Sequence, residues 1–177
     1  MTDSELINHI RRVPDYPVKG IVFFDVTTLF KHPECFEEVV KRICNLYADK
    51  GITKVVGIES RGFIAAAAVA ARLGAGFVPI RKPGKLPADT LREVYSKEYG
   101  TDMIEIHTDA ISPDDVVLIH DDILATGGTA SASVSLVKKF HPKAVYANFI
   151  IDIIDIPRTA PIPAGVEVTS LLQLGEN

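Results

Sequence analysis

Hydrophobic and polar residues change their spacing along the chain between the period of a helix and that of a strand. Apolar side chains recur at i, i+3 and i+4 over residues 34–50, which predicts a helix that stops at Gly51. An alanine-rich run over residues 61–73, followed by Gly74, predicts a second helix, and residues 129–140 predict a third. Short apolar runs predict strands at residues 54–58, 76–80, 116–120 and 145–151.

The order of these elements predicts the fold class. Strands alternate with helices, and repeated βα units of this length imply an α/β fold whose central parallel sheet is flanked by helices on both faces. Ligands of such sheets gather at the carboxyl ends of the strands. The 177 residues contain no repeat, low-complexity tract or interdomain linker, so we expect one domain over residues 1–177.

Three further segments predict structure around the mouth of a site. Residues 16–27 alternate apolar and polar side chains after a Pro/Gly turn, which predicts a covering strand. Residues 81–87 combine two prolines, a glycine and three cations, which is typical of a mobile basic loop. Residues 92–98 and 103–107 alternate like the strands of a hairpin, and such a hairpin could close over a ligand.

Composition excludes several classes of partner. Apolar residues make up 47%, charged residues 24%, and the net charge is −4, which argues against a nucleic-acid surface or a polybasic membrane patch. There is no signal peptide and no apolar run near roughly 18 residues. Cys35 and Cys44 would lie about two and a half turns apart on one helix, too far to bridge. We therefore expect reduced core thiols in a cytoplasmic protein.

Residues 116–130, VVLIHDDILATGGTA, are the most informative stretch. An apolar strand ends in Asp121 and Asp122, and a turn of small and hydroxyl residues then opens a helix. Unpaired N–H groups and the positive dipole end at a helix start can hold a phosphate, and two neighbouring carboxylates can accept hydrogen bonds from sugar hydroxyls. The order predicts a ribose 5-phosphate site, although each turn residue taken singly also suits an ordinary strand–turn–helix junction. The turn residues are Ala125, Thr126, Gly127, Gly128 and Thr129.

Two other kinds of phosphate loop are excluded. The stretch lacks G-x-x-x-x-G-K-[ST], the loop of nucleoside triphosphatases, and it lacks the dinucleotide fingerprint G-x-G-x-x-G.

A second candidate site follows the predicted strand at residues 54–58. A hydrolase interpretation would make Ser60 a nucleophile, but G-x-S-x-G is not satisfied. Arg61 opens a helix after a strand, so its side chain and the backbone N–H groups could bind a second anion. The alternative is a solvated arginine at a turn.

These segments resemble the type I phosphoribosyltransferases over residues 15–173. The diacid and the turn are similar to the family's signature for phosphoribosyl diphosphate (PRPP), in the form found in its adenine-specific members. The resemblance implies that Asp121 and Asp122 contact the ribose hydroxyls and that residues 125–129 cradle the 5-phosphate. His120 departs from the aliphatic residue usual there, and we interpret it as structural.

Two more motifs resemble the family's diphosphate-binding and catalytic loops. They are E-S-R-G-F at residues 59–63, and R-K-x-G-K-L-P followed by x-E-Y-G in the basic hairpin. The resemblance implies that Glu98 transfers a proton and that Tyr99 closes the site, with catalytic roles for Arg61 and Lys85 as well. The implied diphosphate-binding residues are Ser60, Arg61, Arg81 and Lys85.

The fourth motif, similar to Y-P-x-x-G-I-x-F-x-D, lies in an N-terminal hood of about residues 1–30. The resemblance implies that the backbone of Val22 and Phe24 contacts a base and that Phe23 stacks on it. Phe24 replaces the arginine that the family commonly carries. An ordinary core strand is the alternative for Phe23 and Phe24.

The resemblance implies transfer of 5-phosphoribosyl from PRPP to adenine, giving AMP and diphosphate. It further implies Mg²⁺ held mainly by PRPP oxygens and water, with no protein ligand, and a homodimer. One alternative is another purine base, guanine or xanthine, but residues 151–155 lack the lysine that such enzymes often offer. A PRPP-sensing regulator is the other alternative, and it would usually need a DNA-binding domain or a degraded catalytic loop.

Overall fold

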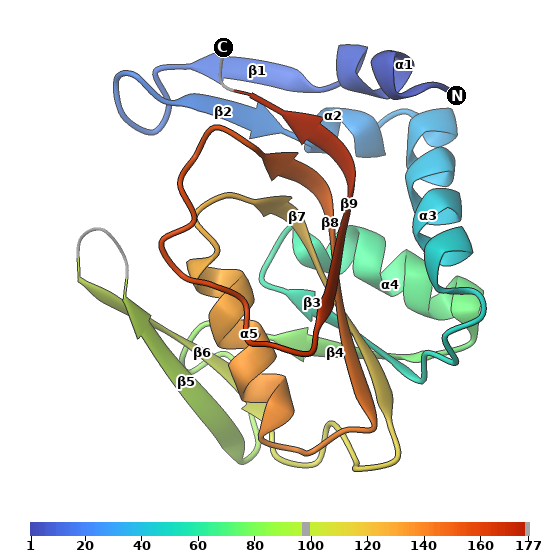
Figure 1. The fold of residues 1–177 in the computed structure, drawn as a ribbon, viewed down its shortest axis with the longest axis vertical. Coiled ribbons are helices and arrows are strands. Elements are labelled where there is room, and N and C mark those ends of the chain that lie inside the picture. Colours follow the sequence, from blue (N-terminus) through green and yellow to red (C-terminus); the bar gives the residue numbers. More distant parts are fainter. Residues whose placement is uncertain (97–99, 176–177) are drawn as a thin grey trace.

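A five-stranded parallel sheet forms the centre of the computed structural model, which describes residues 1–96 and 100–175 (Figure 1). The strand order is β4-β3-β7-β8-β9. The fold class predicted from the sequence is confirmed. The strands are β3 (Lys54–Ile58), β4 (Gly76–Ile80), β7 (Val116–Leu124), β8 (Ala144–Ile153) and β9 (Glu167–Leu174).

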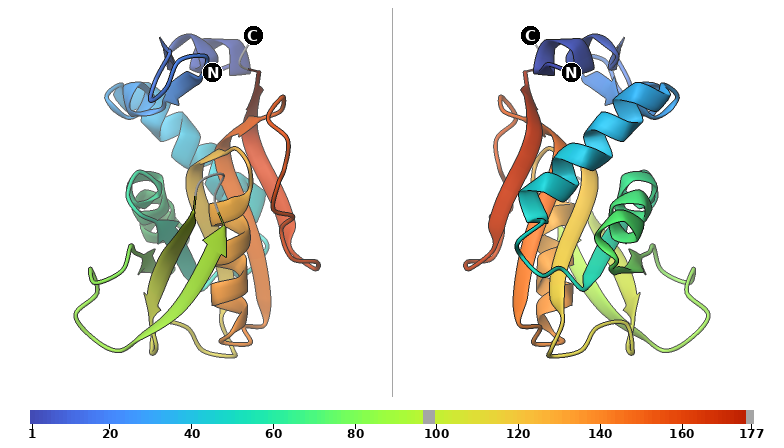
Figure 2. Two further views of the ribbon diagram at one scale, coloured as in Figure 1. Left: turned by 90° about the vertical axis from the view of Figure 1, so that its left-hand side faces the viewer. Right: turned by 90° about the vertical axis from the view of Figure 1, so that its right-hand side faces the viewer.

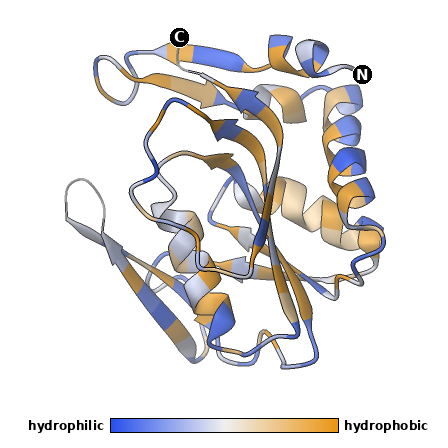
Figure 3. Cartoon of the chain, in the orientation of Figure 1, coloured by the Kyte–Doolittle hydropathy of each residue, from blue (hydrophilic) through white to orange (hydrophobic). Residues whose placement is uncertain are grey.

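Helices cover both faces of this sheet, as predicted. One core cluster joins α3 (Pro33–Tyr47) and α4 (Gly62–Leu73) to one face, and a second joins α5 (Gly128–Lys138) to the other. The ribbon of α4 is coloured almost uniformly as hydrophobic, whereas that of α3 alternates between hydrophobic and hydrophilic residues (Figure 3). The buried residues of α3 are all apolar or cysteine. Small residues let α4 approach the sheet, because a Cβ at Gly57 would lie 3.1 Å from Ala66 Cβ.

An N-terminal hood covers the carboxyl ends of the sheet strands (Figure 1). It contains α1 (Asp3–Asn8), the antiparallel pair β1 (Arg11–Pro14) and β2 (Val22–Asp25), and α2 (Thr27–Phe30). Both termini lie at this end of the molecule (Figure 2). The predicted covering strand is confirmed as β2, but the sequence reading missed α1, β1 and α2.

The predicted hairpin is formed by β5 (Thr90–Ser96) and β6 (Thr101–His107), which begin earlier than expected. Its register pairs Ser96 with Thr101, and residues 97–99 lie outside the described part. The hairpin packs on α5, which lies between it and the sheet (Figure 1).

The strand expected to end at His120 in fact continues to Leu124. It does so because its residues keep pairing with β8, Asp121 with Phe149 and Leu124 with Asp152. The diacid therefore sits on a strand rather than after it, and β9 was not predicted at all. Cys35 and Cys44 are buried free thiols, as expected. Among the described residues, no helix is long and apolar enough to span a membrane.

Candidate active site

The turn between β7 and α5 forms a cradle at the carboxyl end of the sheet. Gly127 is the N-cap of α5 with φ +89°, and no side chain caps the helix, so its first N–H groups face the cavity above them. Alanine could not replace Gly127 without movement, because its Cβ would lie 2.5 Å from the carbonyl oxygen of Ala160. Residues lining the cavity include Asp121, Ala125, Thr126, Gly127, Gly128 and Thr129. The structure thus brings together the predicted phosphate turn and one of the two acids.

The two acids of β7 have different surroundings. The Asp121 carboxyl lies against the first turn of α4, where a Cβ at Gly62 would be 2.8 Å from its Oδ1. Burial raises the pKa of Asp121, and the negative charge of Asp122 raises it further. Asp121 Oδ1 accepts a hydrogen bond of 2.9 Å from the N–H of Asp122.

Arg61 connects the strand ends to the hood. Its Nε donates a hydrogen bond to Asp122 Oδ2, and its guanidinium lies 5.0 Å from the centre of the Phe23 ring. The side chain remains 38% exposed, so it can also reach a ligand. Ser60 is exposed on the same loop, after a cis peptide bond to Glu59.

The basic loop that follows β4 is tied to this loop through Glu59. Arg81 Nε lies 3.1 Å from Glu59 Oε2, which also accepts a hydrogen bond of 2.7 Å from the N–H of Lys82. Burial raises the pKa of Glu59, but these hydrogen bonds and the charge of Lys85 outweigh it and lower the pKa. Lys85 itself is exposed on the loop. Arg81 therefore stands beside the loop of Ser60 and Arg61, as the resemblance implies.

The hairpin contacts the cradle through a residue that sequence reasoning missed. The Tyr95 hydroxyl lies 3.1 Å from Thr129 Oγ1 and donates a hydrogen bond of 3.2 Å to Asp102 Oδ2. Lys82 Nζ pairs with the same carboxylate. Glu98 and Tyr99 lie outside the described residues.

A pocket under the hood opens beside Arg61. It is lined by Val13, Tyr16, Phe23, Asp25, Thr27 and Arg61. The Phe23 ring meets Tyr16 edge-on at 5.3 Å. Phe24 is instead 1% exposed within the core, with the Arg12 guanidinium 5.3 Å from its ring centre. The Phe24 side chain is therefore part of the core, as the alternative interpretation had it. Only the backbone of Phe24, together with that of the half-buried Val22, remains available to contact a base.

Comparison with known proteins gives one consistent result. A family model described as "Phosphoribosyl transferase domain" matches residues 25–154. The adenine phosphoribosyltransferase of Bacteroides thetaiotaomicron is 57% identical over 98% of this chain and 99% of its own length. The adenine phosphoribosyltransferase of Phocaeicola vulgatus is 55% identical over 98% of this chain and 100% of its own length.

This chain belongs to the adenine phosphoribosyltransferases. The structure of the enzyme from Rhodothermus marinus has a TM-score of 0.91 and 48% identity, covering 97% of this chain and 98% of that one. The Giardia lamblia enzyme, solved as a complex with 9-deazaadenine, has a TM-score of 0.89 and 37% identity, with 98% of each chain covered. The predicted family is confirmed.

The β8–β9 loop of this adenine phosphoribosyltransferase also contacts the cradle, and like Tyr95 it was not predicted from the sequence. Arg158 donates hydrogen bonds to the carbonyl oxygen of Ala125 and to the Asp152 carboxylate. The N–H groups of Thr159 and Ala160 donate to the carbonyl oxygen of Thr126 at 3.0 and 3.3 Å. The loop thereby braces the outer side of the cradle. No motif marks Arg158, because its contacts depend on tertiary structure alone.

His120, the residue that departs from the family pattern, lies in the core. It is 1% exposed, and its Nδ1 lies 3.1 Å from Asn148 Oδ1. Burial lowers its pKa to about 4, so the ring is neutral near pH 7. These surroundings agree with the structural interpretation of His120.

Proposed function

We propose that this enzyme transfers the 5-phosphoribosyl group from PRPP to adenine and releases diphosphate, which makes AMP in purine salvage. The observation that carries the proposal is the Arg61–Asp122 pair. It places a cation suited to diphosphate next to an acid suited to ribose, and the cradle of residues 125–129 lies on the same strand end. PRPP carries diphosphate, ribose and 5-phosphate in that order, and its reactive anomeric carbon is the ribose carbon that bears the diphosphate.

Asp121 and Asp122 hold the ribose hydroxyls, and the helix start of α5 holds the 5-phosphate. Both sites are built before substrate arrives, because they rest on a sheet strand and on the brace from Arg158. Holding the sugar still in this way can lower the barrier by up to about 7–11 kcal/mol.

Ser60, Arg61, Arg81 and Lys85 bind the departing diphosphate, and the three cations among them neutralise its charge. The carboxylate oxygens nearby suit a hard cation such as Mg²⁺. Since Asp122 is engaged by Arg61 and the pKa of Asp121 is raised, the residues fit an ion held mainly by PRPP oxygens and water. When bound, that cation supplies further positive charge for the diphosphate.

The hairpin closes the site and excludes water that would hydrolyse the reacting sugar. Glu98 accepts the proton from the base, and Tyr99 covers the site. The contact of Tyr95 with Thr129 supports this assignment, because it fixes the turn end of the hairpin next to the cradle.

Adenine binds under the hood, with Phe23 stacked on it and the backbone of Val22 and Phe24 at its edge. The complex of the Giardia lamblia relative with 9-deazaadenine supports an adenine-shaped pocket. A transferase for guanine or xanthine is the second candidate, because Phe24 replaces the usual arginine. The lack of a lysine over residues 151–155 favours adenine.

We further propose that residues 1–177 form one domain, that two copies form a homodimer, and that the enzyme works in the cytoplasm. Light scattering coupled to size-exclusion chromatography tests the homodimer, since the mass of a monomer would contradict it.

The function is tested by incubating the protein with PRPP, Mg²⁺ and adenine and measuring AMP and diphosphate. We expect the two products in equal amounts and none without PRPP. If PRPP binds in calorimetry but no purine base is converted, the protein is a PRPP sensor instead.

A further inference from the structure

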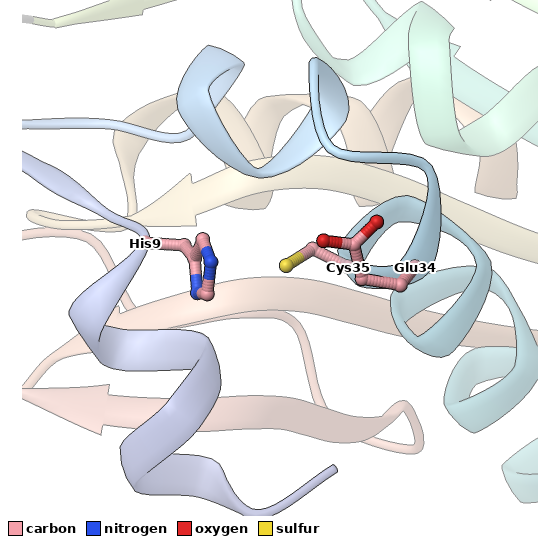
Figure 4. A group of neighbouring side chains, drawn as sticks. All are labelled: His9, Glu34 and Cys35. Atoms are coloured by element: carbon pink, nitrogen blue, oxygen red, sulfur yellow. The ribbon is translucent and has the colours of Figure 1, made fainter.

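Three metal-ligating side chains meet where the hood joins α3, outside the residues assigned above to PRPP or adenine. His9 caps the end of α1, and Glu34 and Cys35 lie in the first turn of α3. Figure 4 shows the Cys35 sulfur directed toward the His9 ring, with the Glu34 carboxylate beside it. One ligand atom from each residue lies within 4.8 Å of the other two.

The His9 ring is already oriented for such a role. Its Nδ1 lies 2.8 Å from the carbonyl oxygen of Glu5, which can only accept, so in the neutral ring Nδ1 carries the proton and Nε2 keeps its lone pair. Metal-binding histidines are commonly held by this kind of bond. The His9 carbonyl is fixed as well, because it accepts a hydrogen bond of 2.5 Å from Thr28 Oγ1.

The donor set suits zinc better than a hard cation. An imidazole nitrogen, a thiol sulfur and a carboxylate oxygen are zinc ligands, whereas Mg²⁺ and Ca²⁺ take oxygen. Bond lengths of about 2.0–2.3 Å in a tetrahedral site put ligand atoms about 3.3–3.8 Å apart. Ligand atoms within 4.8 Å of one another therefore need to approach by at most about 1.0–1.5 Å, and the exposed Glu34 side chain can supply part of this movement.

We propose that His9, Glu34 and Cys35 bind a zinc-class transition-metal ion, with water in the fourth position of the tetrahedron. On binding, the S–H bond of Cys35 breaks, a sulfur–metal bond forms and the proton passes to solvent. The ion clamps α1 of the hood onto α3 and so stabilises the folded chain.

Cobalt binding tests the proposal on the whole reduced chain, stripped of metal by a chelator. We expect one Co²⁺ per chain and a thiolate-to-cobalt charge-transfer band, and we expect one Zn²⁺ to displace it and raise the Tm. Mg²⁺ should neither displace the Co²⁺ nor raise the Tm. Cys35→Ser should abolish the band, whereas Cys44→Ser, which alters the other buried thiol of α3, should leave it unchanged.

His9→Gln and Glu34→Gln change less buried residues, so they keep the test valid if Cys35→Ser fails to fold. Each should weaken Co²⁺ binding by more than about tenfold, since loss of even an outer partner of a ligand costs about 10–100-fold. The proposal is overturned if no thiolate band appears, or if Cys44→Ser removes it. Zinc affinity unchanged in all three ligand variants would overturn it equally.

Discussion

The Nε of Arg61 donates a hydrogen bond to Oδ2 of Asp122, which joins the loop after β3 to the strand β7. The Asp122 side chain is only 4% exposed, whereas that of Arg61 is 38% exposed. The carboxylate therefore depends on this guanidinium for its charge partner, while the guanidinium still faces solvent and a ligand. One pair thus couples the proposed ribose subsite to the proposed diphosphate subsite.

Arg61→Ala should lower kcat/KM for PRPP at least about 100-fold, because it removes a cation at the diphosphate and leaves Asp122 buried without its partner. The kcat/KM of Arg61→Lys should fall between those of wild type and Arg61→Ala, since lysine keeps the positive charge but lacks the planar guanidinium with its two parallel donors. Steady-state kinetics check both variants. Arg72→Ala, at an exposed arginine of α4 paired with Glu37, is the control and should match wild type. Wild-type kinetics for Arg61→Ala would remove Arg61 from the site.

Gly127→Ala should destabilise the fold and weaken PRPP binding together. The substitution places a side chain at φ +89° and 2.5 Å from the carbonyl oxygen of Ala160, so the cradle has to shift. Gly51→Ala is the matched control, because it has φ +66° but meets nothing within 4 Å. Gly51→Ala should cost about 1–2 kcal/mol in urea unfolding and leave PRPP binding unchanged. Equal losses in the two variants would show that the contact with Ala160 is unimportant.

Glu98→Ala should lower kcat by about 10²–10⁴-fold, because it removes the proposed proton acceptor. The Kd for PRPP, measured by calorimetry, should stay within about threefold of wild type. Glu93→Ala alters another acid of the same hairpin, one paired with Lys139, and should keep most of the activity. If Glu98→Ala weakens PRPP binding as much as it lowers kcat, the residue holds substrate and transfers no proton.

Wild-type stability should depend on pH through His120. Burial lowers the pKa of His120 in the folded chain to about 4, against about 6.5 when unfolded. Above pH 6.5 His120 is neutral in both the folded and the unfolded chain, so its contribution to the pH dependence of stability vanishes. As the pH falls toward 4, only the unfolded chain takes up the proton, so wild type loses about 3 kcal/mol relative to His120→Gln.

This prediction is checked by measuring the free energy of urea unfolding of wild type and His120→Gln at several pH values, because the two proteins differ in no other titratable group. His141→Asn, at an exposed histidine, should follow the wild-type curve. A constant difference between wild type and His120→Gln from pH 7 to pH 4 would contradict the assignment.

The sheet and the turn that lines the candidate site were predictable because their signals are local. Periodicity located β3 and β4 to the residue, and the turn chemistry of residues 125–129 predicted the turn that lines the cavity between β7 and α5. The continuation of β7 to Leu124 was not predictable, since polar Asp121 and Asp122 resemble a strand end until their pairing with β8 is known.

The residues that support the site gave no signal. Arg158 and Tyr95 act on the cradle through contacts between segments about 30 positions apart in sequence, and single-sequence patterns do not report such contacts. Short elements such as α1 and β1 were missed for a related reason, because tertiary packing stabilises them more than their own periodicity does.

The most direct test of the account is the ratio of kcat/KM for adenine to that for guanine and xanthine, measured with PRPP and Mg²⁺. Phe23 and the hood backbone predict that adenine is favoured at least about 100-fold. Conversion of guanine or xanthine at a comparable rate, or no conversion of adenine, would contradict it.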